Sequence, residues 1–195
     1  MVFVKICGLR EAEHVEVAIA GKADAIGLVL TPSPRHITAA TARELVTTVD
    51  GRTLTVGVFR GESVDEVERL ATESGVAAVQ LHGDYDRDDV ARLARLGLRV
   101  IRAVPFTDSD DRLGADLLLV DAPHAGSGEQ WDYAVMAERA IPGRWLLAGG
   151  LTAANVAAAV SAASPWGVDV SSGVESARGQ KDATLIRDFL AAAKG

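Results

Sequence analysis

The stretch Val2-Phe3-Val4-Lys5-Ile6-Cys7-Gly8 opens the sequence as a short apolar run that ends in a cysteine and a turn residue. Further apolar runs follow at regular spacing, and most of them lead into a segment with helical periodicity. The predicted strands are 2–6, 25–30, 54–59, 77–81, 99–104, 117–120, 145–148 and 167–170. The predicted helices are 11–20, 39–49, 64–74, 88–96, 132–139, 153–162 and 183–193, and the connection 106–114 is the least helical. The strands are too short and too uniformly apolar for an antiparallel sandwich, so this alternation predicts about eight strand–helix units with parallel strands.

Eight such units predict a closed parallel barrel, an α/β fold of the TIM type, with residues 1–195 in one compact domain. Hydrophobic residues make up 48% of the chain and aromatic residues 5%, so the core consists of aliphatic side chains, as in parallel sheets covered by helices. An open doubly wound sheet is the alternative, although residues 7–10 lack the glycine pattern of a dinucleotide-binding turn. Helices are expected to start after Thr38, Ser63 and Thr152, which are typical N-cap residues.

The composition of the chain argues against some classes of binding partner. The formal charge of −7, from 27 acidic and 20 basic residues without a basic block, argues against nucleic acid. One cysteine excludes an intramolecular disulfide, and neither a leader-like segment nor a long apolar stretch is visible. We therefore expect a soluble cytoplasmic protein without a membrane partner, present as a monomer or homodimer.

Side chains capable of catalysis or binding lie at the carboxyl ends of the predicted strands, where barrels of this type place their active sites. Cys7 ends the first strand and Asp121 follows the sixth. A thiol and a carboxyl group at one mouth can remove a proton from one atom and deliver one to another. For each residue alone, an inert buried thiol and a capping carboxylate are the alternatives. Lys5 lies on the same strand face as Cys7. We expect it to form a buried structural ion pair with an acid such as Asp24 or Asp169, and a catalytic role is the alternative.

Two glycine and serine clusters follow the last two predicted strands. Gly149 and Gly150 leave backbone N–H groups accessible, and Ser171, Ser172 and Gly173 are suited to open a short extra helix after strand eight. Together they predict a phosphate-binding site, because phosphate-binding barrels place this site after strands seven and eight.

Two further side chains lie on neighbouring loops. Arg35 follows the second strand and has the planar guanidinium that grips a carboxylate with two hydrogen bonds, although a solvated surface arginine is the alternative. His82 follows the fourth strand and is ambiguous between a wall of the site and a packed imidazole.

The chain resembles the phosphoribosylanthranilate isomerase family of tryptophan biosynthesis along nearly its whole length. The blocks that carry the resemblance are Val4-Lys5-Ile6-Cys7-Gly8-Leu9, Ser33-Pro34-Arg35, Val79-Gln80-Leu81-His82-Gly83-Asp84, Asp121 with Gly126-Ser127-Gly128, Leu147-Ala148-Gly149-Gly150-Leu151 with Asn155, and Asp169-Val170-Ser171-Ser172-Gly173-Val174-Glu175 with Gly179-Gln180-Lys181-Asp182. Each block is modest evidence, but all of them in this order are specific.

The resemblance implies an Amadori rearrangement of N-(5-phosphoribosyl)anthranilate, a phosphosugar substrate, without metal or cofactor. It implies that Asp121 is the general acid at the furanose ring oxygen and that Cys7 is the general base at sugar carbon 2. By the same resemblance, Arg35 faces the anthranilate carboxylate. His82 and Asp169 line the substrate, and the two glycine and serine clusters bind its phosphate.

Some positions depart from the family pattern. Arg10 stands where threonine is common, Ala125 replaces the first glycine of a Gly-Gly-Thr/Ser-Gly loop, and residues 131–133 read Trp-Asp-Tyr instead of Phe-Asp-Trp. Two other functions stay open: the histidine-pathway Amadori isomerase on the same fold, and a noncatalytic phosphosugar sensor. The former uses an aspartate where this chain has Cys7 and shows a second phosphate site. A sensor has no need for both Cys7 and Asp121.

Overall fold

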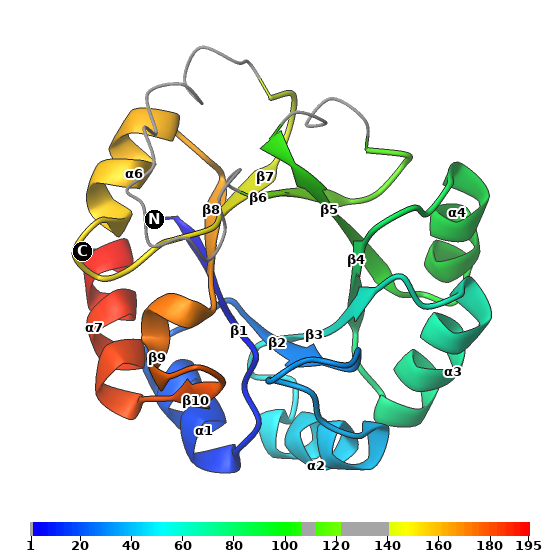
Figure 1. Cartoon of the computed structure of the whole chain (residues 1–195), viewed down its shortest axis with the longest axis horizontal. Coiled ribbons are helices and arrows are strands. Elements are labelled where there is room, and N and C mark those ends of the chain that lie inside the picture. Colours follow the sequence, from blue (N-terminus) through cyan, green and yellow to red (C-terminus); the bar gives the residue numbers. More distant parts are fainter. Residues whose placement is uncertain (1, 107–111, 122–140) are drawn as a thin grey trace.

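The chain forms a closed barrel of parallel strands enclosed by helices, in the order expected from the sequence (Figure 1). The computed structural model describes residues 2–106, 112–121 and 141–195. The barrel strands are β1 (Phe3–Cys7), β2 (Ala25–Val29), β3 (Leu54–Arg60), β4 (Ala78–His82), β5 (Arg99–Pro105), β6 (Leu117–Asp121), β7 (Trp145–Ala148) and β8 (Gly167–Val170). The helices of the described part are α1 (Ala12–Ala20), α2 (Ala39–Val49), α3 (Val64–Ser74), α4 (Arg87–Arg95), α6 (Val156–Ala163) and α7 (Ala183–Lys194). The predicted helix 132–139 lies outside the described residues.

The barrel closes because β1 pairs in parallel with both β2 and β8. The register sets Lys5 beside Ala25 on β2 and beside Asp169 on β8, and sets Cys7 beside Gly27. All eight strands run the same way, so their carboxyl ends meet at one mouth. The open doubly wound sheet is thereby excluded.

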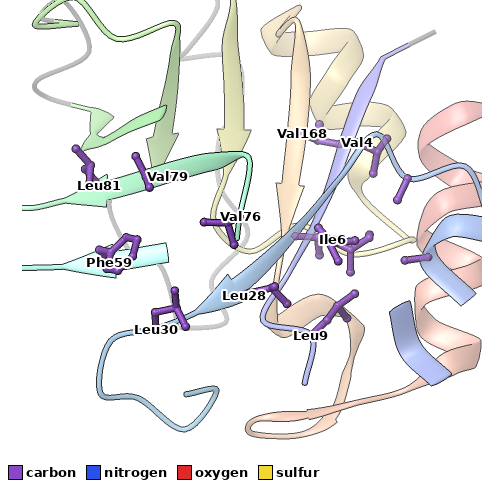
Figure 2. Close-up of a cluster of buried hydrophobic side chains, with 14 of the residues drawn as sticks. Val4, Ile6, Leu9, Leu28, Leu30, Phe59, Val76, Val79, Leu81 and Val168 are labelled. Carbon is purple, nitrogen blue, oxygen red and sulfur yellow. The ribbon is translucent and has the colours of Figure 1, made fainter. Parts of the chain in front are cut away.

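Alternation along each strand divides the core into two parts. Outside the barrel, side chains of the strands and helices form one buried hydrophobic cluster, in which Figure 2 labels Val4, Ile6, Leu9, Leu28, Leu30, Phe59, Val76, Val79, Leu81 and Val168. Side chains that point inward fill the barrel, and its apolar filling contains Ala25, Val56, Ala78, Ile101, Ala103, Leu117, Leu119, Leu146 and Ala148. The aliphatic core predicted from composition is confirmed.

Two predicted helix starts are confirmed and one is wrong. The side chains of Thr38 and Ser63 accept the backbone N–H groups of Thr41 and Glu66 at 3.1 and 3.3 Å. Thr152 does not cap a helix, because α6 begins only at Val156.

The side chain of Asn155 explains this delay. Its Oδ1 accepts the Thr152 N–H at 2.7 Å, and its Nδ2 donates to the Gly150 carbonyl at 3.0 Å. The turn before α6 is therefore fastened to the glycine loop after β7, and the helix starts beyond it.

After β8 the chain makes a short 3-10 helix, η2 (Ser172–Val174), as predicted, and then a small antiparallel hairpin that the sequence did not predict. The hairpin consists of β9 (Glu175–Ala177) and β10 (Gln180–Lys181). Figure 1 shows it beside the end of β1, between α7 and α1. It adds charged side chains to the barrel mouth.

Candidate active site

Cys7 is the last residue of β1 and is buried, with 7% of its surface exposed. Its side chain lies over Gly27 of β2: a Cβ at position 27 would stand 2.7 Å from the Cys7 Sγ and 3.1 Å from the Lys5 Nζ. Real Cβ atoms do not approach this closely, so a glycine at position 27 makes the space for both side chains.

Lys5 is fully buried, and its Nζ lies 2.7 Å from the Asp169 Oδ1 on β8. The expected ion pair is therefore present and its partner is Asp169. The other expected partner, Asp24, instead binds Lys194 at 2.7 Å. Burial lowers the pKa of Lys5, but its interactions with the neighbouring groups, above all with the charge of Asp169, outweigh burial, so the pKa is raised and Lys5 carries its charge.

The electrostatic surroundings of Cys7 act in opposite directions. Burial raises the pKa of the thiol, the nearby charge of Lys5 lowers it, Asp169 raises it and Lys181 lowers it. The pKa ends above its ordinary value, so Cys7 is a neutral thiol near pH 7. A base at this position depends on neighbouring cations to stabilise the thiolate.

Arg35, from the loop after β2, reaches the mouth and is gripped by Glu175 of the hairpin. Its Nε and Nη2 donate to the two carboxylate oxygens of Glu175 at 2.6 and 2.9 Å. The guanidinium has five N–H donors, so this contact leaves capacity for a second acceptor. Contact between Arg35 and a substrate carboxylate stays a prediction.

Glu175 is the hub of this cluster. It also accepts from the Lys181 Nζ at 2.8 Å and from the Gly179 N–H at 3.0 Å. Burial raises the pKa of Glu175, but the hydrogen bonds from Arg35, Lys181 and Gly179 outweigh it and lower the pKa to about 2. The carboxylate is thus charged near neutral pH.

The hairpin is locked against the loops around it. Lys181 donates to the carbonyl and the hydroxyl oxygen of Ser171 at 2.8 and 3.2 Å. A Cβ at Gly179, whose φ is +80°, would lie 2.7 Å from the Pro34 carbonyl oxygen. The loops after β2 and β8 are therefore joined through the hairpin.

The sequence alone pointed to no role for Glu175 or Lys181. The strands that present them are only three and two residues long, too short for a periodic pattern. The only signals were two blocks that carried the resemblance without a function for either residue: the block 169–175, which ends in Glu175, and Gly179-Gln180-Lys181-Asp182.

The two predicted phosphate clusters lie next to each other. Gly149 and Gly150 have φ values of +92° and +66°, in the left-handed region that favours glycine. A Cβ at Gly173 would lie 1.8 Å from the Leu151 carbonyl oxygen, so the first turn of η2 packs directly on the loop after β7. The two glycine loops are therefore in direct contact, and binding of a phosphate by their backbone N–H groups stays a prediction.

His82 ends β4 and lies across the barrel from β8. Its Nε2 is 2.7 Å from the Gln80 Nε2. Burial first, and then the charges of Arg60 and Lys5, lower the pKa of His82 to about 4. The imidazole is therefore neutral at physiological pH, which suits a wall contact or a hydrogen bond better than proton donation.

Asp121 ends β6, paired in register with Pro105 and Ala148. Strand alternation points it inward, as it does Leu117 and Leu119 of the apolar barrel filling. Cys7 and Asp121 therefore end inward-facing rows at the same mouth. The loop after Asp121, including Ala125, 126–128 and 131–133, lies outside the described residues.

Neither a metal centre nor a membrane span is found in residues 2–106, 112–121 and 141–195. No group of three or more His, Cys, Asp or Glu side chains among them is arranged to hold a metal ion. In the same part of the chain, no helix has both the length and the apolar character to cross a membrane.

Comparison with known proteins gives one consistent result. The sequence model of the family described as "N-(5'phosphoribosyl)anthranilate (PRA) isomerase" matches residues 4–192. The N-(5'-phosphoribosyl)anthranilate isomerase of Paracoccus denitrificans is 41% identical, over 98% of this chain and 97% of that protein. The structure of TrpF from Jonesia denitrificans is 48% identical, with a TM-score of 0.91, and the match covers 100% of this chain and 98% of that one. A phosphoribosyl anthranilate isomerase in complex with reduced 1-(o-carboxyphenylamino)-1-deoxyribulose 5-phosphate is 32% identical, with a TM-score of 0.86, over 100% of both chains.

Proposed function

The chain belongs to the N-(5'-phosphoribosyl)anthranilate isomerase family, and we propose that Cys7 and Asp121 carry out the acid–base chemistry of its reaction. The reaction is the Amadori rearrangement of N-(5-phosphoribosyl)anthranilate to 1-(2-carboxyphenylamino)-1-deoxyribulose 5-phosphate, a step of tryptophan biosynthesis. The family match removes the support for a histidine-pathway isomerase and for a noncatalytic sensor.

The first step opens the sugar ring. Asp121 gives a proton to the furanose ring oxygen, the bond from that oxygen to carbon 1 breaks, and the nitrogen lone pair forms the C=N bond of a protonated Schiff base. A carboxyl group at the end of β6 suits this task because it points into the mouth where the ring would lie.

The second step moves a proton off carbon 2. The Cys7 thiolate takes that proton, the C–H electron pair becomes a C1=C2 double bond, and the C=N electron pair returns to nitrogen. The resulting enol–amine then becomes the ketone product by proton transfer to carbon 1. Carbon 1 takes up one proton as the enol hydroxyl gives one up. Cys7 ends as the thiol, and the Asp121 carboxylate regains from water a proton that equals the one the thiol first released, so atoms and charge balance.

The remaining site residues are proposed to hold the substrate. Backbone groups of Gly149, Gly150, Ser171, Ser172 and Gly173 bind the phosphate at the two adjacent loops. Binding of the phosphate fixes the sugar beneath the acid and the base. Such positioning raises the rate by a large factor, provided that the geometry is correct to about 1 Å.

Contacts at the other end of the substrate complete the proposal. Arg35 binds the anthranilate carboxylate in competition with Glu175, and His82 and Asp169 line the sugar or the aromatic ring. The observation that carries the assignment of roles is that Cys7 and Asp121 end two inward-facing rows at the same mouth as the glycine loops. Cytoplasmic location and a monomeric or dimeric state stay predictions.

The test is conversion of the anthranilate substrate, followed as loss of its fluorescence, by the wild type and by the Cys7→Ser and Asp121→Asn variants. Each variant should lower kcat by about 10²- to 10⁴-fold, the contribution of one general acid or base, with little change in affinity for a product analogue. Near-normal turnover in either variant would retract the role of that residue.

A further inference from the structure

Lys5 is among the largest fully buried side chains of the described residues, and it is the charged member of that group. A buried ion pair is weak as a stabilising device, because well-packed apolar residues of similar size often do as well. In register with Lys5 stand its partner Asp169 on β8 and Ala25 on β2, and Ala25 belongs to the apolar filling of the barrel. The presence of an ammonium group here calls for a reason beyond folding.

Geometry links the ammonium to the catalytic sulfur. The Cys7 Sγ and the Lys5 Nζ both border the space that a side chain at position 27 would fill, at 2.7 and 3.1 Å from where its Cβ would stand, so the ammonium and the sulfur lie close together. On its other side the ammonium is held 2.7 Å from Asp169. Asp169 on β8, Lys5 and Cys7 thus form a buried row of neighbouring polar groups that ends at the sulfur in the mouth.

Charged groups from every neighbouring element bear on this sulfur. Lys5 acts from β1, Asp169 from β8, Lys181 from β10 and Arg35 from the loop after β2. Glu175 binds both Lys181 and Arg35 directly and so offsets much of their charge. Lys5 is the cation with the strongest effect on the sulfur, and it exceeds the opposing effect of Asp169.

We propose that Lys5 is a positioning residue for the isomerisation: its ammonium, oriented by Asp169 and lying beside the Cys7 sulfur, stabilises by its charge the thiolate that removes the proton from carbon 2. This inference rests on the proposed function of Cys7 as the base. The thiol first releases its proton to water at the mouth, and the thiolate then accepts the substrate proton. Lys5 stays protonated throughout and forms no bond to the substrate.

The thiolate is measurable directly, because Cys7 is the chain's only cysteine. Titration of thiolate ultraviolet absorbance, with Cys7→Ser as the blank, and the pH dependence of alkylation both report on this group alone. Lys5→Met should raise the apparent pKa of Cys7 by about 1–3 units, the effect of losing a close opposite charge. An unchanged titration midpoint in Lys5→Met would overturn the inference.

Two further variants make the titration decisive. Lys194→Met removes a lysine with the same 2.7 Å contact to a carboxylate, Asp24, but away from Cys7, and should leave the midpoint unchanged. The double variant Lys5→Met/Asp169→Asn leaves no unpaired buried charge, so it carries the test if Lys5→Met does not fold. Its midpoint should lie above that of the wild type and below that of Lys5→Met, because both opposing influences are gone.

Turnover separates this inference from the proposed function. In Lys5→Met, kcat near pH 7 should fall about 10- to 1,000-fold, in step with the thiolate fraction, and should recover as the pH is raised. If Cys7→Ser is inactive but the midpoint of Lys5→Met is that of the wild type, the role of Lys5 fails and the base stands. If the midpoint shifts while turnover near neutral pH does not, Cys7 is not the base and both proposals fail.

Discussion

The two ends of the barrel interior differ sharply although the same strands build both. Along β6 the inward positions are Leu117, Leu119 and finally Asp121. Along β1 they change in the same direction, from Phe3 to Lys5 and Cys7. The amino-terminal end is apolar, and the carboxyl-terminal end is charged and hydrogen-bonded.

Packing at the amino-terminal end is of the ordinary core kind. Phe3 stacks on Trp166 with ring centroids 4.5 Å apart. Leu146 packs closely on Gly167, since a Cβ added at position 167 would lie 2.5 Å from the Leu146 side chain. At the mouth, glycines at positions 27 and 173 are needed because polar or backbone groups occupy the space of a side chain. The difference teaches that stability and turnover should respond to substitutions at opposite ends of the barrel.

Apart from the acid, the base and Lys5, the largest effect on activity is expected from Gly173→Ala at the mouth. The new Cβ would lie 1.8 Å from the Leu151 carbonyl oxygen, so the two glycine loops must move apart. A shift of about 1 Å in groups that position a substrate costs on the order of 10²-fold, and we expect this loss in kcat/KM from steady-state kinetics.

Gly97→Ala is the matched control for that variant. Position 97 has a φ of +83°, and a Cβ added there would have nothing within 4 Å, so the substitution brings backbone strain without a clash. It should cost about 1–2 kcal/mol of stability and leave kcat/KM as it is. If Gly173→Ala kept the wild-type kcat/KM, turnover would not depend on the close packing of the two glycine loops.

The opposite response is expected from Leu146→Ala at the amino-terminal end. Leu146 is fully buried in the barrel filling, so truncation should lower the free energy of unfolding by about 2–5 kcal/mol, measured by denaturant titration. The kcat of the folded variant should equal that of the wild type. Leu96→Ala, at a leucine that is 49% exposed, should change stability by less than about 0.5 kcal/mol. A folded Leu146→Ala protein with impaired turnover would break the comparison.

A smaller effect is expected from Arg35→Ala, which removes a guanidinium from the mouth. A hydrogen bond to a charged group contributes about 1.5–3 kcal/mol, so KM should rise about 10- to 100-fold while kcat changes less. The variant also loses the hydrogen bonds from Arg35 to Glu175, which keeps Lys181 and Gly179 as its donors. Because this loss can lower stability, the kinetics should be measured at a temperature at which the variant is fully folded. Unchanged KM would discard the contact with the substrate carboxylate.

The barrel was predictable because its signals are local. The helices at 39–49 and 64–74 were placed correctly, and their caps Thr38 and Ser63 act within three residues. Strand ends were less exact: Cys7, His82 and Asp121 are the last residues of their strands, one position beyond the predicted ends. Polar residues ended the apolar runs, but the backbone pairing of a closed barrel continued through them.

The parts of the site that the sequence did not predict depend on distant contacts. Glu175 meets Arg35 across 140 positions of the chain, and no periodic pattern reports such a pairing. The failed cap at Thr152 has a similar cause, since the Asn155 side chain engages Gly150 and Thr152 instead of leaving Thr152 to start a helix. The sequence therefore identified the site residues that end strands, but it did not identify those on the short hairpin at the mouth.

The smallest effect at neutral pH is expected from the titration of His82. Its pKa is about 4 in the folded protein and about 6.5 when unfolded, because burial and the charges of Arg60 and Lys5 disfavour the imidazolium. Between these values the unfolded chain binds more protons than the folded one. The stability from neutral His82 is thus complete above about pH 6.5 and is lost as the pH falls toward 4.

Two measurements check this titration. The ring signals of His82 in NMR spectra should stay constant from about pH 8 to pH 5.5 and move only nearer to pH 4. The His82→Gln variant should lose less stability than the wild type over that lower range, because glutamine has no proton to gain. A His82 midpoint near 6.5 would mean that the imidazole is well solvated, and the β4 side of the mouth would then be open to water instead of forming a wall of the site.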